Sequence, residues 1–518
     1  MAGETVREVV IVGGGSAGWL TAGVIAAEHR DRNGPTLRVT VVESPDVPAI
    51  GVGEGTWPTM RDTLRRIGVG EAEFVRTCDA TFKQGSQFIG WVDGRPQDRY
   101  SHPFSLPQGF GEVQLGATWA ARGDEASFAH LASVQPHLCD AGRGPKQFAT
   151  PEYAAVANYA YHLDATALGG FLRAHCIDRL GVRHVVGHME GIETHDNGDI
   201  AALRVRDQPA IGGDLFVDCT GMRALLIGAH YGVPTTPVDE VLFNDRALAL
   251  QVPYAAADTP IACQTRATAQ SAGWIWDIGL SARRGVGHVY ASAFISDDQA
   301  EAELHAYIAA SGGAPAHQLP AARRIDLQPG YRRTPWHRNC VAIGLAAGFV
   351  EPLEASALVL VELAAARLAE EMPTDRADMD LLAARFNHTF AERWQRVVEF
   401  LKLHYLLSRR DTPYWQAHRA QHSVPQALRE RLQLWRHQPP SRADFPRSEE
   451  IFPSASWQYI LYGMGVRPQP RPARRTEDPA QAQARFEEVA ALSRRMLPAL
   501  PAHRALVEHI KAHGLPRL

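Results

Sequence analysis

A glycine-rich turn near the start of the chain constrains the fold more than any other feature of the sequence. Val9–Val12 is a β-branched run of the kind that forms buried parallel strands, and it leads directly into Gly13-Gly14-Gly15-Ser16-Ala17-Gly18. A helix is expected over Trp19–Glu28 and a second strand over Leu37–Glu43. This Gly13-x-Gly15-x-x-Gly18 pattern between a strand and a helix predicts a nucleotide-binding βαβ unit, and therefore an α/β fold with a Rossmann-like body.

Each residue of the pattern has a physical role in such a site. Gly13 allows the tight turn, Gly15 lets the backbone approach a pyrophosphate, and Gly18 allows the helix to pack closely on the strand. Ser16 and Ala17 lie where the helix begins, and a helix N-terminus attracts phosphate groups.

The motif alone does not distinguish NAD from FAD. Glu43, at the end of the second expected strand, can accept hydrogen bonds from a ribose in either cofactor. The position of the motif at the extreme N-terminus of a long chain favours FAD. Leu215–Gly221 and Ala342–Gly344 also resemble the later segments with which FAD-dependent monooxygenases complete their flavin site, which makes Gly344 a further candidate for flavin contact.

The rest of the chain predicts one large body followed by a helical part. Residues 44–58 are rich in Gly and Pro and are expected to form a loop, whereas 185–205 and 241–296 alternate in the manner of β-strands. Helical spacing dominates later in the chain. We therefore expect residues 1–370 to form an FAD-binding α/β body with an inserted β-sheet, and residues 371–518 to form a mainly helical cap.

Composition and charge argue against several classes of protein. The formal net charge of −4 gives no sign of the clustered basic surface that binds nucleic acid. The sequence has no apolar run long enough for a transmembrane helix and no N-terminal targeting pattern. The six cysteines lack CxxC spacing, so we expect neither a disulfide framework nor a metal site. This use of cysteine is typical of a reducing compartment, so we expect a cytoplasmic location. The oligomeric state stays open, a homodimer included.

Several motifs spread along the chain carry a family resemblance when they are taken together. They are Ile50-Gly51-Val52-Gly53-Glu54-Gly55-Thr56-Trp57-Pro58, Thr81-Phe82-Lys83-Gln84-Gly85, His102-Pro103-Phe104, Gly273-Trp274-Ile275-Trp276-Asp277-Ile278, Phe349-Val350-Glu351-Pro352-Leu353-Glu354, and Trp457 with Gly463-Met464-Gly465. With them, the chain from Val9 to about Pro468 resembles the flavin-dependent tryptophan halogenases. The resemblance implies an enzyme that uses reduced FAD from a separate flavin reductase, O2, and chloride or bromide. Such an enzyme halogenates an electron-rich aromatic substrate, such as an indole or a tryptophan-like compound.

Trp274 and Trp276 correspond to the family motif WxWxIP, with Gly279 in place of the proline. One residue separates them, so both rings lie on the same face of an expected strand. The resemblance implies that the two rings wall the flavin off from the organic substrate. Ordinary packing on one face of a sheet would be the plainer interpretation of the pair alone.

Lys83 matches the family's catalytic lysine, near the start of a strand expected over Thr81–Val92. Its ammonium carries three donors and could hydrogen-bond hypohalous acid, whereas a lowered pKa would permit a haloamine instead. The sequence leaves both mechanisms open. Outside the matching segment, a solvated lysine at a strand end would be the ordinary interpretation.

Glu354 matches the family's catalytic glutamate, which positions hypohalous acid or takes a proton from the halogenated ring. A helix is expected to begin near Pro352, with Glu354 at about its third position, where a capping role is the alternative. The family continues Glu-Ser-Thr-Gly, whereas this chain continues Glu354-Ala355-Ser356-Ala357. The resemblance implies that the halide lies against the backbone N–H groups of Ser356 and Ala357. The added methyl group of Ala357 leads to the hypothesis that bromide is favoured.

His102 and Phe104 match a family segment that holds the indole, and Trp457 is a further candidate for the same role. An imidazole and a phenyl ring could sandwich a flat substrate by stacking. Packing within the protein is the alternative for each of the three. The substrate itself stays open between tryptophan, a free indole and a larger indole-bearing molecule.

Two other functions fit the nucleotide motif. An FAD-dependent hydroxylase is one, and the tryptophan pair and Lys83 argue against it. A flavin-binding protein without catalytic activity is the other, and it stays open because of the changes at Ala355, Ala357 and Gly279.

Overall fold

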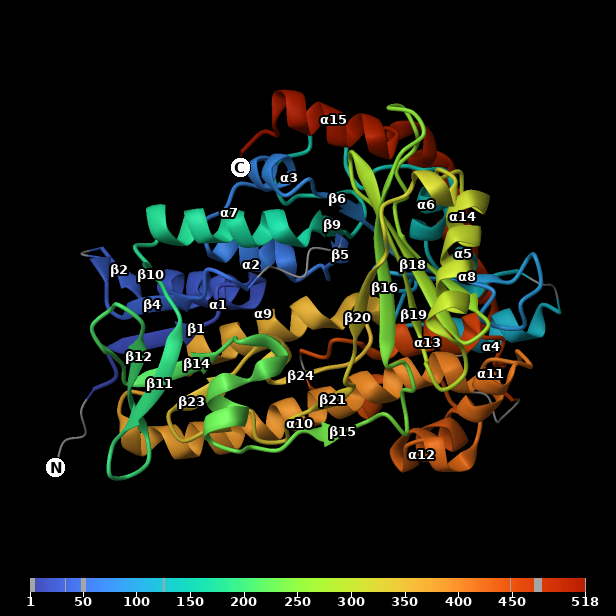
Figure 1. The fold of residues 1–518 in the computed structure, drawn as a ribbon. Coiled ribbons are helices and arrows are strands. Elements are labelled where there is room, and N and C mark those ends of the chain that lie inside the picture. The colour runs from blue at the N-terminus through green and yellow to red at the C-terminus, as the bar shows by residue number, and fades with distance from the viewer. Residues whose placement is uncertain are drawn as a thin grey trace.

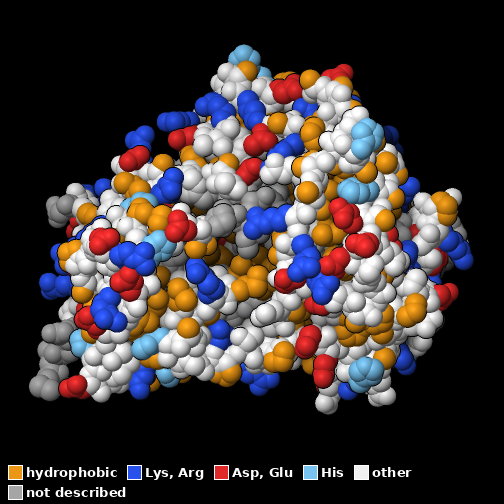
Figure 2. All heavy atoms as spheres, in the orientation of Figure 1, with side chains coloured by type: hydrophobic (Ala, Val, Ile, Leu, Met, Phe, Trp, Pro, Cys, Tyr) orange, Lys and Arg blue, Asp and Glu red, His pale blue; other side chains and the backbone are white. Residues whose placement is uncertain are grey.

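Figure 1 shows the computed structural model, which describes residues 5–32, 34–47, 53–123, 126–447, 449–469 and 478–517. The motif residues Ile50, Gly51 and Val52 lie outside these ranges. Acidic and basic side chains are interspersed over the face drawn in Figure 2. Among the described helices, none is both long enough and apolar enough to cross a membrane.

A six-stranded sheet with the order β10-β4-β1-β14-β23-β22 forms the centre of the body. Its strands are β10 (Arg183–Val186), β4 (Arg38–Glu43), β1 (Glu8–Val12), β14 (Leu215–Asp218), β23 (Cys340–Ala342) and β22 (Trp336–His337). The pairings are parallel except that between β22 and β23. Val9 and Ile11 pack into one hydrophobic core while Val10 and Val12 pack into another, as expected for a sheet buried on both faces.

The predicted βαβ unit is confirmed. Helix α1 (Ser16–Glu28) links β1 to the parallel strand β4 and packs against α7 (Ala165–Asp178) and α9 (Ser356–Glu370). The chain is a mixed α/β protein, as the sequence predicted.

A second sheet with the order β20-β16-β19-β18-β17-β7-β8 stands beside the first (Figure 1). Its strands are β20 (Arg323–Asp326), β16 (Arg246–Pro253), β19 (Arg283–Tyr290), β18 (Gly273–Gly279), β17 (Thr265–Gln270), β7 (Gly85–Ile89) and β8 (Arg99–Pro103). Its neighbours are antiparallel apart from β7 and β17, so the expected alternation over 241–296 is confirmed. Strand β18 carries the tryptophan pair.

The prediction of a single strand over Thr81–Val92 is wrong. The segment forms β6 (Thr81–Lys83) and β7, which belong to different sheets, since β6 joins β5 (Gly53–Gly55) and β9 (Ala160–Asp164) in the order β5-β9-β6. Gly85 makes the break possible: its φ is 135°, and a side chain there would overlap the carbonyl oxygen of His102. Lys83 is therefore the last residue of a short strand. Strand β5 also lies within the segment that was expected to be a loop.

Residues 371–518 consist of helices and loops in their described part. Their α-helices are α10 (Arg376–Leu406), α11 (Pro413–His418), α12 (Gln426–Trp435), α13 (Ser454–Gly463), α14 (Pro479–Ala499) and α15 (His503–His513). They wrap around the body, because α10 packs against β22 whereas α15 packs against α3 on the opposite side in Figure 1.

The remaining α-helices and strands complete the fold. They are α2 (Met60–Arg66), α3 (Glu71–Thr77), α4 (Leu115–Ala121), α5 (Phe128–Ala132), α6 (Gln135–Asp140), α8 (Asp297–Ala310), β2 (Arg30–Asp31), β3 (Gly34–Pro35), β11 (Met189–Thr194), β12 (Ile200–Val205), β13 (Ile211–Gly212), β15 (Thr236–Pro237), β21 (Gly330–Tyr331) and β24 (Gly348–Phe349).

Candidate active site

The turn between β1 and α1 is tight enough to need its glycines. Gly13 has a φ of 113°, and a side chain there would overlap the carbonyl oxygen of Cys219. A Cβ atom at Gly18 would overlap the carbonyl oxygen of Gly13. A Cβ atom at Gly15, by contrast, would meet nothing within 4 Å, so this side of the turn is open to a ligand.

Other predicted nucleotide contacts converge on the same turn. Glu43, at the end of β4, lines the same cavity as Ser16 and Ala17, and its Oε2 lies 2.9 Å from His184 Nε2. Gly344 follows β23 with a φ of 72°, and a Cβ atom there would lie 2.8 Å from that of Ala17. Residues that are distant in the sequence therefore lie together around this turn.

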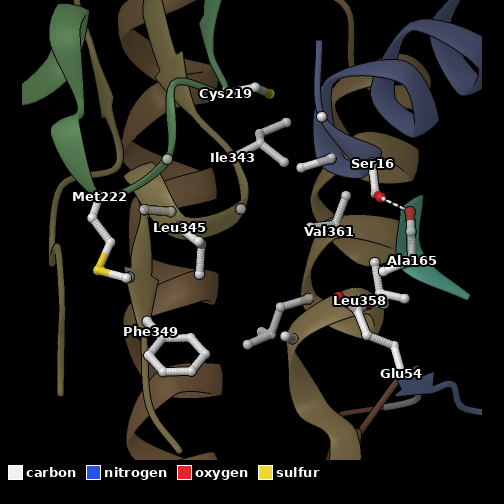
Figure 3. Close-up of a pocket in the computed structure, with 18 of the residues that line it drawn as sticks. Ser16, Glu54, Ala165, Cys219, Met222, Ile343, Leu345, Phe349, Leu358 and Val361 are labelled. Carbon is white, nitrogen blue, oxygen red and sulfur yellow. Dashed lines mark hydrogen bonds between the residues drawn. The ribbon is translucent and has the colours of Figure 1, made fainter. Parts of the chain in front are cut away.

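These features fit FAD. No side chain caps the first turn of α1, so its N–H groups can bind a pyrophosphate, and Glu43 offers an acceptor for a ribose. The adjoining cavity has a volume of about 530 Å³, and Figure 3 shows apolar side chains facing one another across it. Those labelled on its walls are Met222, Ile343, Leu345, Phe349, Leu358 and Val361.

We call this space the flavin cavity, and it extends from the nucleotide turn to the predicted catalytic pair. Lys83 and Glu354 both line it, as do Trp274 and Trp276. The two indole rings lie 6.4 Å apart on β18 with an interplanar angle of 63°. A small molecule formed in this cavity can therefore reach Lys83 and Glu354 without leaving the protein.

Lys83 lies beside the turn that carries Glu354. A Cβ atom at Gly55 would lie 3.2 Å from Lys83 Nζ and 3.5 Å from the Cβ of Ala355, so these two groups flank the same glycine. The Lys83 Nζ atom also lies 5.3 Å from the centroid of the Phe104 ring. Burial lowers the pKa of Lys83 to about 8, against the opposing effect of the Glu354 carboxylate.

The Glu354 carboxylate is held by hydrogen bonds to both oxygens. Its Oε1 accepts from His102 Nδ1 at 2.6 Å, and its Oε2 accepts from Ser86 Oγ at 3.0 Å. Burial alone would raise the pKa of Glu354, but its interactions with His102 and other neighbours outweigh burial and lower it. The side chain is therefore a fixed, ionised acceptor.

His404 approaches the same carboxylate from α10. Its Nε2 lies 3.7 Å from Glu354 Oε1, and its Nδ1 contacts the Tyr100 hydroxyl at 2.7 Å. Burial lowers the pKa of His404 to about 3, so the ring is neutral. A neutral ring that accepts from Tyr100 at Nδ1 carries its proton on Nε2, directed toward Glu354.

Glu354 does not occupy the third position of a helix, as the sequence had suggested. Helix α9 begins at Ser356, and Glu354 lies before it with a φ of 61°. Ala355 is also left-handed, with a φ of 55°. The hydrogen bond from Trp57 Nε1 to the Glu354 carbonyl oxygen, 2.7 Å long, helps to hold this turn.

The predicted halide contacts open the helix that follows this turn. Ser356 and Ala357 form the first turn of α9, line the flavin cavity, and receive no side-chain cap from Ala355. Their backbone N–H groups can therefore bind an anion.

A second cavity, of about 420 Å³, is lined by residues that contact the predicted catalytic pair. We call it the substrate cavity, because the predicted substrate contacts His102 and Phe104 lie on its wall. His102 and Phe104 line it, so it touches Glu354 through His102 and Lys83 through Phe104. Trp57 and Tyr459 add aromatic surface to the same wall. The His102 ring is hydrogen-bonded to Glu354, so this predicted substrate contact joins the cavity to the predicted catalytic carboxylate.

Trp457 is not among the described residues that line either cavity. Its ring is fully buried and packs against Phe400, Trp435 and Phe445, and its Nε1 donates to the Phe452 carbonyl oxygen at 3.0 Å. The structure therefore does not bring Trp457 together with the other predicted substrate contacts.

Sequence reasoning missed four residues of the site. Ser86 and His404 carry no motif of their own and reach Glu354 only through the fold. Trp57 lies within a matching segment, but nothing in that segment indicates an indole bonded to the catalytic turn. Glu54 lines the flavin cavity, and burial raises its pKa to about 7.

Comparison with known proteins decides the family. The family model described as tryptophan halogenase matches residues 8–478. The chain belongs to the tryptophan halogenase family. The tryptophan 6-halogenase SttH of Streptomyces toxytricini is 36% identical over 523 residues, which cover 95% of this chain and 96% of SttH.

Solved structures of the family agree with this assignment. A tryptophan halogenase from Shewanella frigidimarina superposes with a TM-score of 0.95 at 45% identity and covers 99% of both chains. The flavin-dependent halogenase BrvH from Brevundimonas superposes with a TM-score of 0.84 at 35% identity, covering 98% of this chain and 99% of BrvH. The protein is a flavin-dependent halogenase, an enzyme that uses FAD, O2 and a halide to halogenate an electron-rich aromatic compound.

Proposed function

We propose that this enzyme halogenates tryptophan or a closely related indole amine, with hypohalous acid guided to Lys83 and Glu354. The observation that carries the proposal is the position of this pair. Both residues line the flavin cavity, and each contacts a residue of the substrate cavity. The tryptophan substrates of relatives such as SttH support the choice of an indole.

Bound reduced FAD supplies, with O2, the oxidising power that converts halide to hypohalous acid. Lys83 then donates a hydrogen bond to the oxygen of the acid and directs its halogen toward the substrate cavity. Transfer of the halogen to a ring carbon leaves hydroxide, whose charge the Lys83 ammonium stabilises.

Glu354 completes the reaction by taking the proton from the halogenated ring carbon. It is ionised, and the hydrogen bonds from His102 and Ser86 fix its direction. A fixed, ionised carboxylate is suited to general base catalysis. Trp274 and Trp276 line the flavin side of the passage and, in this proposal, keep the aromatic substrate from the flavin.

The charges around the substrate cavity favour an indole that carries an ammonium group. Glu449 and Glu450 line it, and the described lining contains no lysine or arginine. Glu449 pairs with Arg393 at 2.7 Å, and burial raises the pKa of Glu450 against the effects of Arg396, Arg447 and Arg393. A substrate ammonium beside Glu450 would favour its ionised form in the same way. Trp57, Phe104 and the other apolar side chains suit the flat ring.

A substrate panel tests this proposal. With a flavin reductase, O2 and bromide, we expect tryptophan and tryptamine to gain one halogen, and indole-3-acetate to react least because its carboxylate faces Glu450. Mass spectrometry distinguishes a halogenated from a hydroxylated product. Hydroxylation of these indoles, or a preference for indole-3-acetate, would contradict the proposal.

The pH dependence follows from Lys83. If the ammonium form acts, the rate of halogenation falls as the pH rises through about 8, because Lys83 then loses its proton. Lys83→Arg stays charged throughout, so any activity that this variant retains should lack the falling limb. A rate that instead rises through about pH 8 would favour a haloamine.

The halide preference follows from Ala357. We expect bromide to outcompete chloride in a mixture of the two, because a methyl group reshapes the wall beside the first turn of α9. The ratio of brominated to chlorinated indole measures the preference, and Ala357→Gly should move it toward chloride. Clear preference of the unmodified enzyme for chloride would contradict this expectation.

The source of reduced flavin is also part of the proposal. We expect a separate flavin reductase to supply it by diffusion, which is consistent with a single nucleotide-binding βαβ unit among the described residues. The cytoplasmic location stays a prediction of the sequence, and the oligomeric state stays open.

A further inference from the structure

A buried polar cluster lies behind the ring of Trp274. Glu351 Oε2 accepts three hydrogen bonds: from Trp274 Nε1 at 2.8 Å, from the Tyr405 hydroxyl at 2.6 Å and from Asn244 Nδ2 at 2.5 Å. The Tyr414 hydroxyl donates to Asn244 Oδ1 at 2.9 Å and extends the network. We call these five residues the Glu351 cluster. Its members come from β18, α10, α11 and two loops, so only the tertiary fold assembles it.

Burying the Glu351 carboxyl group costs free energy. Burial raises the pKa of Glu351, against the effect of its three donors, and Glu351 Oε1 has no hydrogen-bond partner among the described residues. Lys402 is a buried amine nearby whose pKa is lowered by burial to about 7, against the effect of Glu351. Its Nζ contacts Val241 O, His418 Nδ1 and Ser423 Oγ. Buried groups of this kind are weak contributors to stability but orient their partners strongly.

We propose that Glu351 is a positioning residue for Trp274, holding its indole in the orientation that separates flavin from substrate. The indole has one donor, and Glu351 accepts it, so the bond selects one of the two faces that the ring could present to the flavin cavity. Glu351 also lies three residues before Glu354, on the segment that forms the catalytic turn. One segment therefore anchors both the wall and the catalytic carboxylate. This inference rests on the proposed function.

Glu351→Leu removes the acceptor at similar volume, whereas Glu351→Gln keeps one oxygen for Trp274. The measured quantity is halogenated product per reduced flavin oxidised. Glu351→Leu removes all three hydrogen bonds to the carboxylate, of which the one from Trp274 Nε1 orients the indole. We expect the loss of that bond to lower the ratio about tenfold, and the ratio to stay within about twofold of the original enzyme in Glu351→Gln. Glu399→Leu is the matched control: it removes a buried glutamate of α10, bonded to Arg431, without touching Trp274.

The Trp274→Phe background separates positioning from general damage. Phenylalanine has no donor for Glu351. If Glu351 acts through Trp274, adding Glu351→Leu to Trp274→Phe should therefore lower the ratio no further. If the two substitutions act independently, their effects on the ratio should add. Equal effects of Glu351→Leu in both backgrounds, or an unchanged ratio, would overturn the inference.

A second measurement does not depend on catalysis. In protein labelled with 5-fluorotryptophan, the fluorine signal absent from Trp274→Phe belongs to Trp274. We expect one narrow line in the original protein and in Glu351→Gln, and a split or broadened line in Glu351→Leu. An unaltered fluorine line in Glu351→Leu would overturn the inference, whether or not the enzyme halogenates an indole. Failure to halogenate any indole would count against the proposed function alone.

Discussion

Lys83→Ala is expected to slow halogenation by about 10²–10³ while leaving FAD binding unchanged. The Lys83 ammonium is the buried cation beside Glu354, and the variant removes the donor that directs hypohalous acid. Loss of a preorganised donor of this kind costs on the order of 10²–10³ in rate. Product formation with saturating reduced flavin and bromide measures the effect, and titration of the protein with FAD measures cofactor affinity.

The control for this variant is Lys511→Ala. Lys511 pairs with Asp79 and is not among the described residues that line either cavity, so its loss should leave the rate near that of the original enzyme. Halogenation by Lys83→Ala within about tenfold of the original rate would be too fast for the role assigned to Lys83.

Glu354→Gln is expected to lower the rate by about 10²–10⁴, the usual contribution of a general base. The amide keeps the shape of the side chain and can still accept from His102, but it cannot take a proton from the ring. The expected signature is a low rate with little change in the KM of the indole. Deuterium at the reacting carbon should then slow product formation, because proton removal has become limiting.

Glu362→Gln provides a matched control on the same segment. Glu362 is a buried carboxyl of α9 whose Oε2 accepts from Thr63 Oγ1 at 2.6 Å, and burial raises its pKa to about 8. It is therefore already neutral at pH 7, and its amide should behave like the original enzyme. If Glu354→Gln and Glu362→Gln lost activity equally, damage to α9 would explain both.

Much of the fold could be predicted because its signals are local. The turn at Gly13–Gly18 and the β-branched runs on either side fixed the βαβ unit, and β18 keeps both tryptophans on one face. The prediction of one strand over Thr81–Val92 was wrong because the hydrophobic pattern does not reveal where the chain leaves one sheet and enters another. That change depends on Gly85, whose backbone packs against His102 on another strand.

The candidate site was only partly predictable, for the same reason. Lys83 and Glu354 stand in recognisable motifs, and the fold brings them to one cavity. Ser86 lies 268 positions from Glu354 in the chain, so no spacing rule links them. His404 is an ordinary residue of a long helix until the fold directs it at the carboxylate. Helical pattern likewise placed Glu354 inside α9, whereas its positive φ lies outside the helix.

The central claim is that an oxidant formed in the flavin cavity is used at Lys83 and Glu354 without leaving the protein. The most direct measurement is bromination of tryptophan in the presence of an excess of a thioether scavenger too bulky to enter either cavity. We predict that the original enzyme keeps its yield of bromotryptophan under conditions in which the scavenger fully suppresses bromination by added hypobromite. Equal suppression of both reactions would mean that the oxidant escapes into solution and would contradict the account.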